Sequence, residues 1–434
     1  MESVKRFFFR MRESFWFLPV IYGLAAIFSI IFIKLLDTAI IHNWEKSIPA
    51  VFLTSADISK ELYSALTTAI LTMTTISFST IMVVLTTYST QFSPRTLQDF
   101  MRSKSTHHVL GVYTFGFLFA LFNLLLVGKE DQFLRPVFMV ITAICGLALF
   151  IYFIHMTSKQ IRVNSLIEEI RKDGTRLICG TYKEKNYIEA SSWKQSELER
   201  ITREKRETIY AEEAGYVQNI DWKELFRWAE KEDVILESHV QAGGYILQQA
   251  PLISIIGLGE PTDKKKRLDK LLRFITIGSE RSDVQDIEFM IEKIVEIALR
   301  AISPAVNDPH TAINCINRLG SLLVELGKHN KETRYLANKE DKLRVIRPTI
   351  TFPKYLYRCF YQIKHYGRED VSVLYGLLDT LAKVAFVSES DIRRHIWNYH
   401  YEVLDVFDWQ TLSNQDYLHM QEAYERLVEH CEKR

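Results

Sequence analysis

In TTAILTMTTISFSTIMVVLTTYST, which runs from Thr67 to Thr90, twelve of the 24 residues are Ser or Thr, and none is charged, Gly or Pro. Apolar side chains fill most of the remaining positions. About 20 helical residues, rising 1.5 Å each, cover the hydrocarbon core of a bilayer. The stretch is therefore long enough to form a membrane-spanning helix.

The hydroxyl groups of this stretch gather on one side of the predicted helix. At about 100° per residue, five of them fall within roughly 40° of one line, and a methionine fills the gap between them. Apolar residues lie on the opposite side. The line consists of Thr68, Thr72, Thr75, Ser79, Met82 and Thr86, and the apolar side contains Leu66, Ile70, Met73, Ile81 and Val84.

Four segments near the start of the chain have the length and composition of membrane spans. They are Phe15 to Ile33, Leu62 to Tyr88, His107 to Val127 and Phe133 to Met156. A signal peptide is the alternative for the first segment. No small-residue cleavage site follows that segment, and its apolar run is too long, so we expect a retained anchor.

The distribution of positive charge predicts the orientation in the membrane. Lys and Arg gather before the first span, after the second and after the fourth, whereas acidic residues balance the cations of the other two loops. Cytoplasmic loops are enriched in Lys and Arg. We therefore expect a multi-pass membrane protein with both termini in the cytoplasm.

The chain has 434 residues and a net charge of +1, but its two parts differ in composition. Residues 1–158 carry 12 Lys/Arg and 9 Asp/Glu, and the remaining 276 residues carry 42 and 44. We expect an α-helical membrane domain of four transmembrane helices (1–158), followed by a cytoplasmic mixed α/β part. That part divides into a helical and charged connector (159–213) and an α/β domain (214–434) that is mainly helical after residue 262.

Local signals predict several elements of the cytoplasmic part. Gly215 to Asp221 reads as a strand leading into a helix with Asp221 as its N-cap, and Asp308 followed by Pro309 begins another helix. Short strands around the Gly243-Gly244 turn form either an ordinary sheet or a small barrel-like lobe. Predicted strands are 234–239, 245–248 and 252–256; predicted helices are 263–273, 283–302, 352–366, 370–387 and 391–401.

Four blocks of sequence point to a known family. They are QFSPRTLQDF (91–100), GYVQNID (215–221), GSERSDVQD (278–286) and IALRAISPAVNDPHTA (297–312). With these blocks the chain resembles the bacterial predicted-membrane-protein family known as domain of unknown function 2254, from about residue 10 to residue 400. The resemblance implies the architecture described above and no biochemical role.

The hydroxyl line on the second span has two interpretations. Ser and Thr allow membrane helices to approach and to hydrogen-bond across their interface, so the line is typical of helix packing. Alternatively, copies of the helix around a symmetry axis would line a path for ions, which requires a homo-oligomer. Gln91 and Arg95 would then lie at the cytoplasmic mouth, although an arginine in this position is more often a cation that anchors a helix at the lipid headgroups.

Five polar residues in the family-like blocks form a second candidate site: Arg281, Asp286, Arg300, Asn307 and Asp308. We expect them to converge at one end of a helix pair. Helix capping and a buried ion pair would require these same residue types. The functional alternative is a small-ligand or ion site at the helix N-terminus near Asp308, where backbone amides favour an anion.

The sequence contains no pattern typical of catalysis or of metal binding. The sequence contains no GxxxxGK, HExxH or GxSxG pattern, and its five widely spaced cysteines form no CxxC or Cys/His pair. We expect no enzyme, no cofactor, no metal and no nucleic-acid partner. The first hypothesis is a homo-oligomeric ion channel of the bacterial inner membrane, in contact with lipid and ions, whose cytoplasmic domain assembles or gates it. The second is a non-conducting receptor or scaffold whose cytoplasmic domain binds a small ligand or a protein, and the third is a membrane-anchored enzyme.

Overall fold

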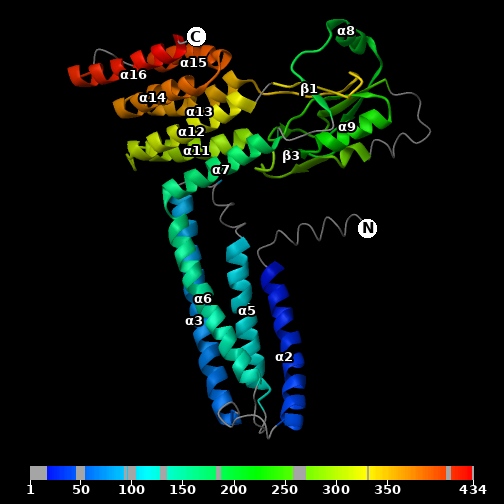
Figure 1. Cartoon of the computed structure of the whole chain (residues 1–434), viewed down its shortest axis with the longest axis vertical. Coiled ribbons are helices and arrows are strands. Elements are labelled where there is room, and N and C mark those ends of the chain that lie inside the picture. The colour runs from blue at the N-terminus through cyan, green and yellow to red at the C-terminus, as the bar shows by residue number, and fades with distance from the viewer. Residues whose placement is uncertain are drawn as a thin grey trace. The chain divides into compact units, whose positions relative to one another are not determined.

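The computed structural model of the chain describes residues 17–44, 54–91, 95, 104–127, 134–181, 187–257, 270–329, 332–406 and 412–432. The chain divides into two units, Met1–Ser165 and Leu166–Arg434, which we call the N-terminal unit and the C-terminal unit (Figure 1). Each unit has its own core.

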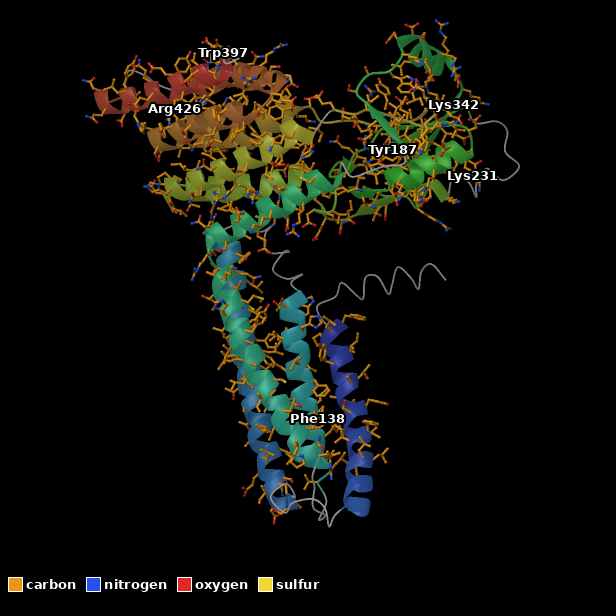
Figure 2. All side chains as sticks on the ribbon, in the orientation of Figure 1. Phe138, Tyr187, Lys231, Lys342, Trp397 and Arg426 are labelled. Carbon is orange, nitrogen blue, oxygen red and sulfur yellow. The ribbon has the colours of Figure 1, made fainter. Side chains whose placement is uncertain are left out.

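The described part of the N-terminal unit contains four long helices: α2 (Phe17–Trp44), α3 (Ala56–Gln91), α5 (Lys104–Leu125) and α6 (Leu134–Gln160). All four are long and apolar enough to cross a membrane. Helix α5 packs against the other three, and α3 also packs against α6. Aromatic rings fill part of the α5–α6 contact, where Phe138, labelled in Figure 2, lies 5.2 Å from the ring of Phe119. The prediction of four apolar helices before a mixed α/β region is confirmed.

One face of α3 holds the helix in this unit. Its buried residues Tyr63, Ile70, Ser77 and Val84 recur every seven positions, which is about two helical turns. A Cβ on Gly116 of α5 would lie 3.0 Å from Ile70, so the glycine allows the two helices to approach closely. The predicted apolar side of α3 is therefore its packing side.

A six-stranded sheet forms one layer of the C-terminal unit, in the order β1-β8-β9-β4-β6-β2. Only the β4–β9 pair is parallel. The strands are β1 (Ile188–Ala190), β2 (Arg206–Tyr210), β4 (Ile235–Ser238), β6 (Pro251–Ile256), β8 (Tyr335–Ala337) and β9 (Leu343–Ile346). Helix α8 (Gln195–Arg203) lies between β1 and β2 in sequence. The predicted connector (159–213) thus supplies two strands and helix α8 from residue 188 onward.

A second, three-stranded antiparallel sheet has the order β5-β3-β7. Its strands are β3 (Gly215–Ile220), β5 (Tyr245–Ile246) and β7 (Ile275–Gly278). Helix α9 (Trp222–Lys231) follows β3, and Asp221 caps it by accepting a hydrogen bond from the Glu224 amide, as predicted. Buried side chains from both sheets and α9, including Val217, Phe226 and Ile255, share one hydrophobic core.

The rest of the C-terminal unit is helical: α7 (Val163–Thr181), α11 (Ile287–Ala301), α12 (Pro309–His329), α13 (Phe352–Tyr366), α14 (Val371–Val387), α15 (Ser390–Leu404) and α16 (Asn414–Glu432). Helix α14 packs against α12 and α16, and α11 packs against α12 and α13. Arg426 of α16 (Figure 2) donates to the Tyr375 hydroxyl of α14 at 2.8 Å. The predicted helices after residue 283 are confirmed; most of the predicted 263–273 helix lies outside the described residues.

Close approach of α12 and α14 depends on Gly320. A Cβ at this position would lie 2.4 Å from Cγ2 of Thr380, closer than real atoms pack. Gly180 in α7 is a matched comparison, because a Cβ there would meet no atom within 4 Å.

We expect Gly320→Ala to lower the stability of the C-terminal unit by about 1–3 kcal/mol through overpacking. The same substitution at Gly180 should be neutral or stabilise by roughly 0.5–1 kcal/mol, because alanine favours the helix. Thermal unfolding of the purified full chain, followed by circular dichroism, measures both. Equal melting temperatures for the two variants would contradict the close approach of α12 and α14.

Candidate functional site

The predicted hydroxyl line lies on the exposed surface of the N-terminal unit. Thr68, Thr72, Thr75, Ser79, Met82 and Thr86 are all exposed in the described chain, and Met82 is 61% exposed. Flanking apolar residues of α3 are exposed as well, among them Leu71, Phe78 and Val83. The exposed face of α3 is thus a line of hydroxyl groups bordered by apolar side chains.

Threonine hydroxyls on this face donate to their own helix. The hydroxyl of Thr75 donates to the Leu71 carbonyl at 2.9 Å, and Thr72 and Thr86 donate four residues back in the same way. All nine threonines between residues 67 and 90 make this bond. Their hydroxyl hydrogens are therefore occupied within the helix, and the oxygen lone pairs remain available on its surface.

The predicted mouth residues are described only in part. Gln91 is the last residue of α3, and its side chain lies outside the described residues. Arg95 is half-buried. Their role at a pore mouth stays a prediction.

The five polar residues of the second candidate site fall into two groups. Arg281 and Asp286 lie together at the N-terminal end of α11, whereas Arg300 lies in its last turn. About 14 residues of helix, at 1.5 Å each, separate the two ends by roughly 21 Å. The structure therefore does not bring Arg281 and Asp286 together with Arg300, Asn307 and Asp308.

Asn307 and Asp308 form the turn between α11 and α12. Asn307 has a φ of +51°, a left-handed conformation that asparagine tolerates better than most residues. Asp308 is the predicted N-cap: its carboxylate accepts from the Thr311 amide at 3.1 Å and from the Thr311 hydroxyl at 2.6 Å. These hydrogen bonds lower the pKa of Asp308. The turn is accounted for by capping alone.

A network of ion pairs surrounds the start of α11. Asp286 caps the helix by accepting from the Phe289 amide at 2.9 Å and pairs with Arg281 at 2.7 Å. Arg281 also pairs with Glu292 at 2.6 Å. Arg358 of α13 continues the chain of charges to Glu292 and, at 2.8 Å, to Glu288. The network joins the β7–α11 loop, α11 and α13.

Burial of this network changes its protonation equilibria. The Asp286 side chain is only 1% exposed, and burial raises its pKa despite the nearby guanidinium of Arg281. Burial also raises the pKa of Glu288 against the attraction of Arg358. In this buried environment the ionised form of each carboxyl group depends on its arginine partner.

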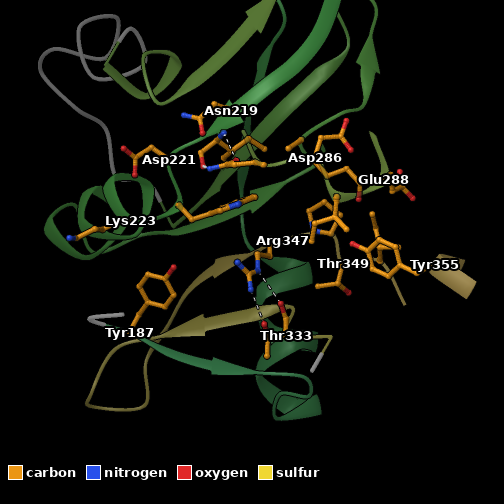
Figure 3. Close-up of a pocket in the computed structure, with 18 residues that line it drawn as sticks. Tyr187, Asn219, Asp221, Lys223, Asp286, Glu288, Thr333, Arg347, Thr349 and Tyr355 are labelled. Carbon is orange, nitrogen blue, oxygen red and sulfur yellow. Dashed lines mark hydrogen bonds between the residues drawn. The ribbon is translucent and has the colours of Figure 1, made fainter. Parts of the chain in front are cut away.

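Asp286 also forms part of a cavity of about 450 Å³ in the C-terminal unit (Figure 3). The cavity is bounded by the N-terminal ends of α9 and α11, the β4–β5 turn and the segment after β9. Its volume falls within the range of small-molecule sites. Polar side chains in its lining include Asn219, Asp221, Lys223, Gln241 and Thr349.

Two anchors position the cavity wall. The Gln285 side chain bonds both backbone groups of Ile220 at 3.0 Å, so the β7–α11 loop is fixed to β3. Gly243 lies against Asp286: it has a φ of +84°, and a Cβ there would lie 2.0 Å from a carboxylate oxygen. Only glycine fits this combination of backbone conformation and space.

Arg347 lines the cavity on the side opposite Asn219 and Asp221 (Figure 3). Its guanidinium donates to the carbonyl and the hydroxyl of Thr333 at 3.0 and 2.8 Å, as the dashed lines in Figure 3 show, and pairs with Glu189 at 2.9 Å. Burial raises the pKa of the neighbouring Tyr187 to about 12, so its hydroxyl stays protonated at neutral pH. The cavity lining thus contains hydrogen-bond donors and acceptors, and both positively and negatively charged side chains.

Sequence reasoning identified Asp286 and Arg281 but missed most of this site. Glu292 and Arg358 are 66 residues apart, and Glu189 and Arg347 are 158 residues apart. The one local signal was that Glu288 and Glu292 are four residues apart and therefore lie on the same face of α11. The sequence around them does not indicate which arginine pairs with them.

We expect Arg281→Ala to destabilise the C-terminal unit by about 3–5 kcal/mol at neutral pH, because Asp286 is left buried without its partner. Arg227→Ala, which removes an exposed pair with Glu224 on α9, should change stability by no more than about 1 kcal/mol. Unfolding by denaturant measures both changes.

The pH dependence gives a second readout of the same variant. Removing Arg281 raises the pKa of Asp286 further, because the attraction that opposes burial is lost. The destabilisation should therefore be smallest in acid, where this carboxyl is protonated, and grow as the pH rises through its folded pKa. A loss of stability in Arg281→Ala that does not vary with pH would show that the destabilisation does not come from burying the ionised Asp286 without a partner.

Comparisons with known proteins place the chain in a family. A sequence profile described as "Predicted membrane protein (DUF2254)" matches residues 12–383. The uncharacterized protein MT1328 of Mycobacterium tuberculosis (strain CDC 1551 / Oshkosh) is 28% identical over 325 residues, and the uncharacterized protein Mb1321c of Mycobacterium bovis is 27% identical over 325 residues. The match covers 71% of this chain and 60% of each of these relatives. No solved structure matches significantly. The chain therefore belongs to the DUF2254 family of predicted membrane proteins.

Proposed function

We propose that this protein is a homo-oligomeric ion channel of the bacterial inner membrane and that the hydroxyl face of α3 lines its path. The observation that carries the proposal is the exposure of all six residues of the hydroxyl line, while the opposite side of the same helix is buried against α5 and α6. A face that a single chain leaves uncovered is available to a second copy, to water or to ions.

Oligomerisation is a necessary part of this proposal. Four helices around their own buried core leave no room for a wide aqueous path, so the path lies between copies of α3. The exposed apolar residues that border the hydroxyl line, such as Leu71 and Val83, would pack against neighbouring copies. The hydroxyl line would then face the symmetry axis. Both termini lie in the cytoplasm in this arrangement, and no chemical reaction is assigned to the protein.

We expect the reconstituted full chain to show discrete single-channel openings in symmetric salt, and Thr75→Trp to abolish them by filling the path. Ile144→Trp is the matched control, because Ile144 is 62% exposed on α6, away from the hydroxyl line. Planar-bilayer recording of the three proteins makes the comparison.

Native mass spectrometry in detergent accompanies these recordings and shows whether each variant keeps the subunit number of the parent. Openings that persist unchanged in the assembled Thr75→Trp variant would place the path elsewhere. Silence of the folded, oligomeric parent protein across voltage would contradict the channel itself.

The cavity in the C-terminal unit favours a second candidate function, a membrane receptor that binds a small polar ligand. It is of ligand size and has donors and acceptors from four segments of the chain. This function is compatible with the first if ligand binding regulates opening, and it replaces the first if the protein does not conduct.

We expect Ala242→Trp to fill the cavity from the β4–β5 turn and to remove any ligand-induced rise in melting temperature. Thermal-shift measurements with nucleotides, amino acids and sugars on the full chain identify such a ligand. A compound that stabilises the variant and the parent equally binds outside the cavity, and the receptor role of this cavity would then be rejected.

A further inference from the structure

Three side chains with metal-binding atoms meet where the end of α7 lies against the end of α12. The Sγ atom of Cys179 is 3.8 Å from Nε2 of His329 and 3.9 Å from Oε2 of Glu325. The His329 and Glu325 atoms are 3.6 Å apart. Among the described residues this is the one such group of at least three His, Cys, Asp or Glu side chains.

These separations match the face of a tetrahedral zinc site. Bonds of about 2.3 Å to sulfur and about 2.0–2.2 Å to nitrogen and oxygen place the ligand atoms roughly 3.4–3.6 Å from one another. The three measured separations lie within a few tenths of an ångström of that range. An ion would therefore need small side-chain adjustments and no movement of either helix.

The ligand types also fit a divalent transition metal. A thiolate and a carboxylate together balance the charge of Zn²⁺, and a neutral imidazole completes three of its four positions. Three protein ligands with a fourth position open to water are typical of zinc sites that remain accessible. The side chains of Glu325 and His329 are 25% and 37% exposed, which leaves a route for the ion.

Contacts between the two helices hold the three side chains in place. A Cβ on Gly174 of α7 would lie 3.0 Å from Leu322 of α12, so the helices are close at this point. Nearer the start of α7, Glu168 pairs with Arg318 of α12 at 3.1 Å. The α7 side chains of Ile167, Ile170 and Ile178 are buried. The donors therefore project from helices that are already packed.

A simple ion pair accounts for only part of this arrangement. Glu325 and His329 are one turn apart on α12, and Lys328 binds the other carboxylate oxygen of Glu325 at 3.2 Å. That pairing gives no reason for a thiol to lie against both groups, because sulfur is a weak hydrogen-bond partner. A metal ion accounts for all three.

We propose that Cys179, Glu325 and His329 bind Zn²⁺ and that the ion links α7 to α12. Helix α6 ends at Gln160 and α7 begins at Val163, so the linked helix follows the last apolar helix after two residues. Metal binding would fix the first helix of the C-terminal unit to its helical core. This inference is independent of ion conduction and of the cavity.

Cobalt(II) is the direct probe of the site, because a cobalt–thiolate bond produces a charge-transfer absorption band. The purified full chain, stripped with a chelator, should bind one Co²⁺ with this band and release it to Zn²⁺. Cys179→Ser should remove the band and weaken binding by more than about tenfold. Even the loss of a residue that only hydrogen-bonds a metal ligand weakens metal binding about tenfold or more, so the loss of a ligand should cost at least as much. Cys431→Ser is the control, because burial raises the pKa of that thiol to about 11 and makes it a poor ligand.

Thermal unfolding separates loss of metal from loss of folding. Zn²⁺ should raise the melting temperature of the parent and of Cys431→Ser but not that of Cys179→Ser or Glu325→Gln. Without metal, all four should melt at similar temperatures; Glu325→Gln replaces Cys179→Ser in the comparison if the latter does not fold. The absence of a stoichiometric cobalt–thiolate band in the parent, or its persistence in Cys179→Ser, would overturn the proposal.

Discussion

The buried ion pair between Asp286 and Arg281 is the contact on which the arrangement of the C-terminal unit depends. Asp286 accepts from the first turn of α11, pairs with Arg281 and lies against Gly243. Through Glu292 and Arg358 the same charges reach α13. A single carboxylate therefore connects the three-stranded sheet, the β7–α11 loop and the helical part. The cavity exists where these three parts meet.

Burying these charges carries a penalty that neighbouring groups offset. Three acids and two arginines form the network, and burial raises the pKa of two of the acids. Such a network is weak evidence for stability, because apolar residues could fill the same space at lower cost. It does restrict the geometry, since each guanidinium meets its carboxylates in defined directions. Restricting the geometry of a cavity wall is consistent with a binding role for the cavity.

Features encoded by neighbouring residues were predictable from the sequence. The N-caps Asp221 and Asp308 depend on the next three residues, and the two sides of α3 depend on helical periodicity; all of these are confirmed. Contacts between distant residues were not predictable. The charged stretch before Gly215 gives no strong strand signal, yet β2 pairs with β6 through backbone bonds that require no side-chain pattern. Cys179 and His329 are 150 residues apart and meet only because α7 and α12 pack together.

The candidate sites show the same division. Asp286 and Arg281 are five residues apart and meet as expected. Arg300 was expected to join them, but it lies at the other end of α11. Proximity in sequence over 14 helical residues becomes separation in space, since the helix is rigid and straight over that length. The exposed hydroxyl line of α3 was visible in the sequence, but its function depends on what covers it.

The internal hydrogen bonds of the α3 threonines determine which chemistry that face can meet. Each hydroxyl hydrogen points back to a carbonyl of its own helix, so the outward surface presents oxygen lone pairs and methyl groups. Such a surface solvates positive charge and hydrogen-bond donors and offers little to an anion. In addition, every such carbonyl accepts two hydrogen bonds, which weakens the backbone ladder and makes a helix easier to bend. Helix α3 thus presents an electron-rich surface and is easier to bend, although it contains no proline or glycine.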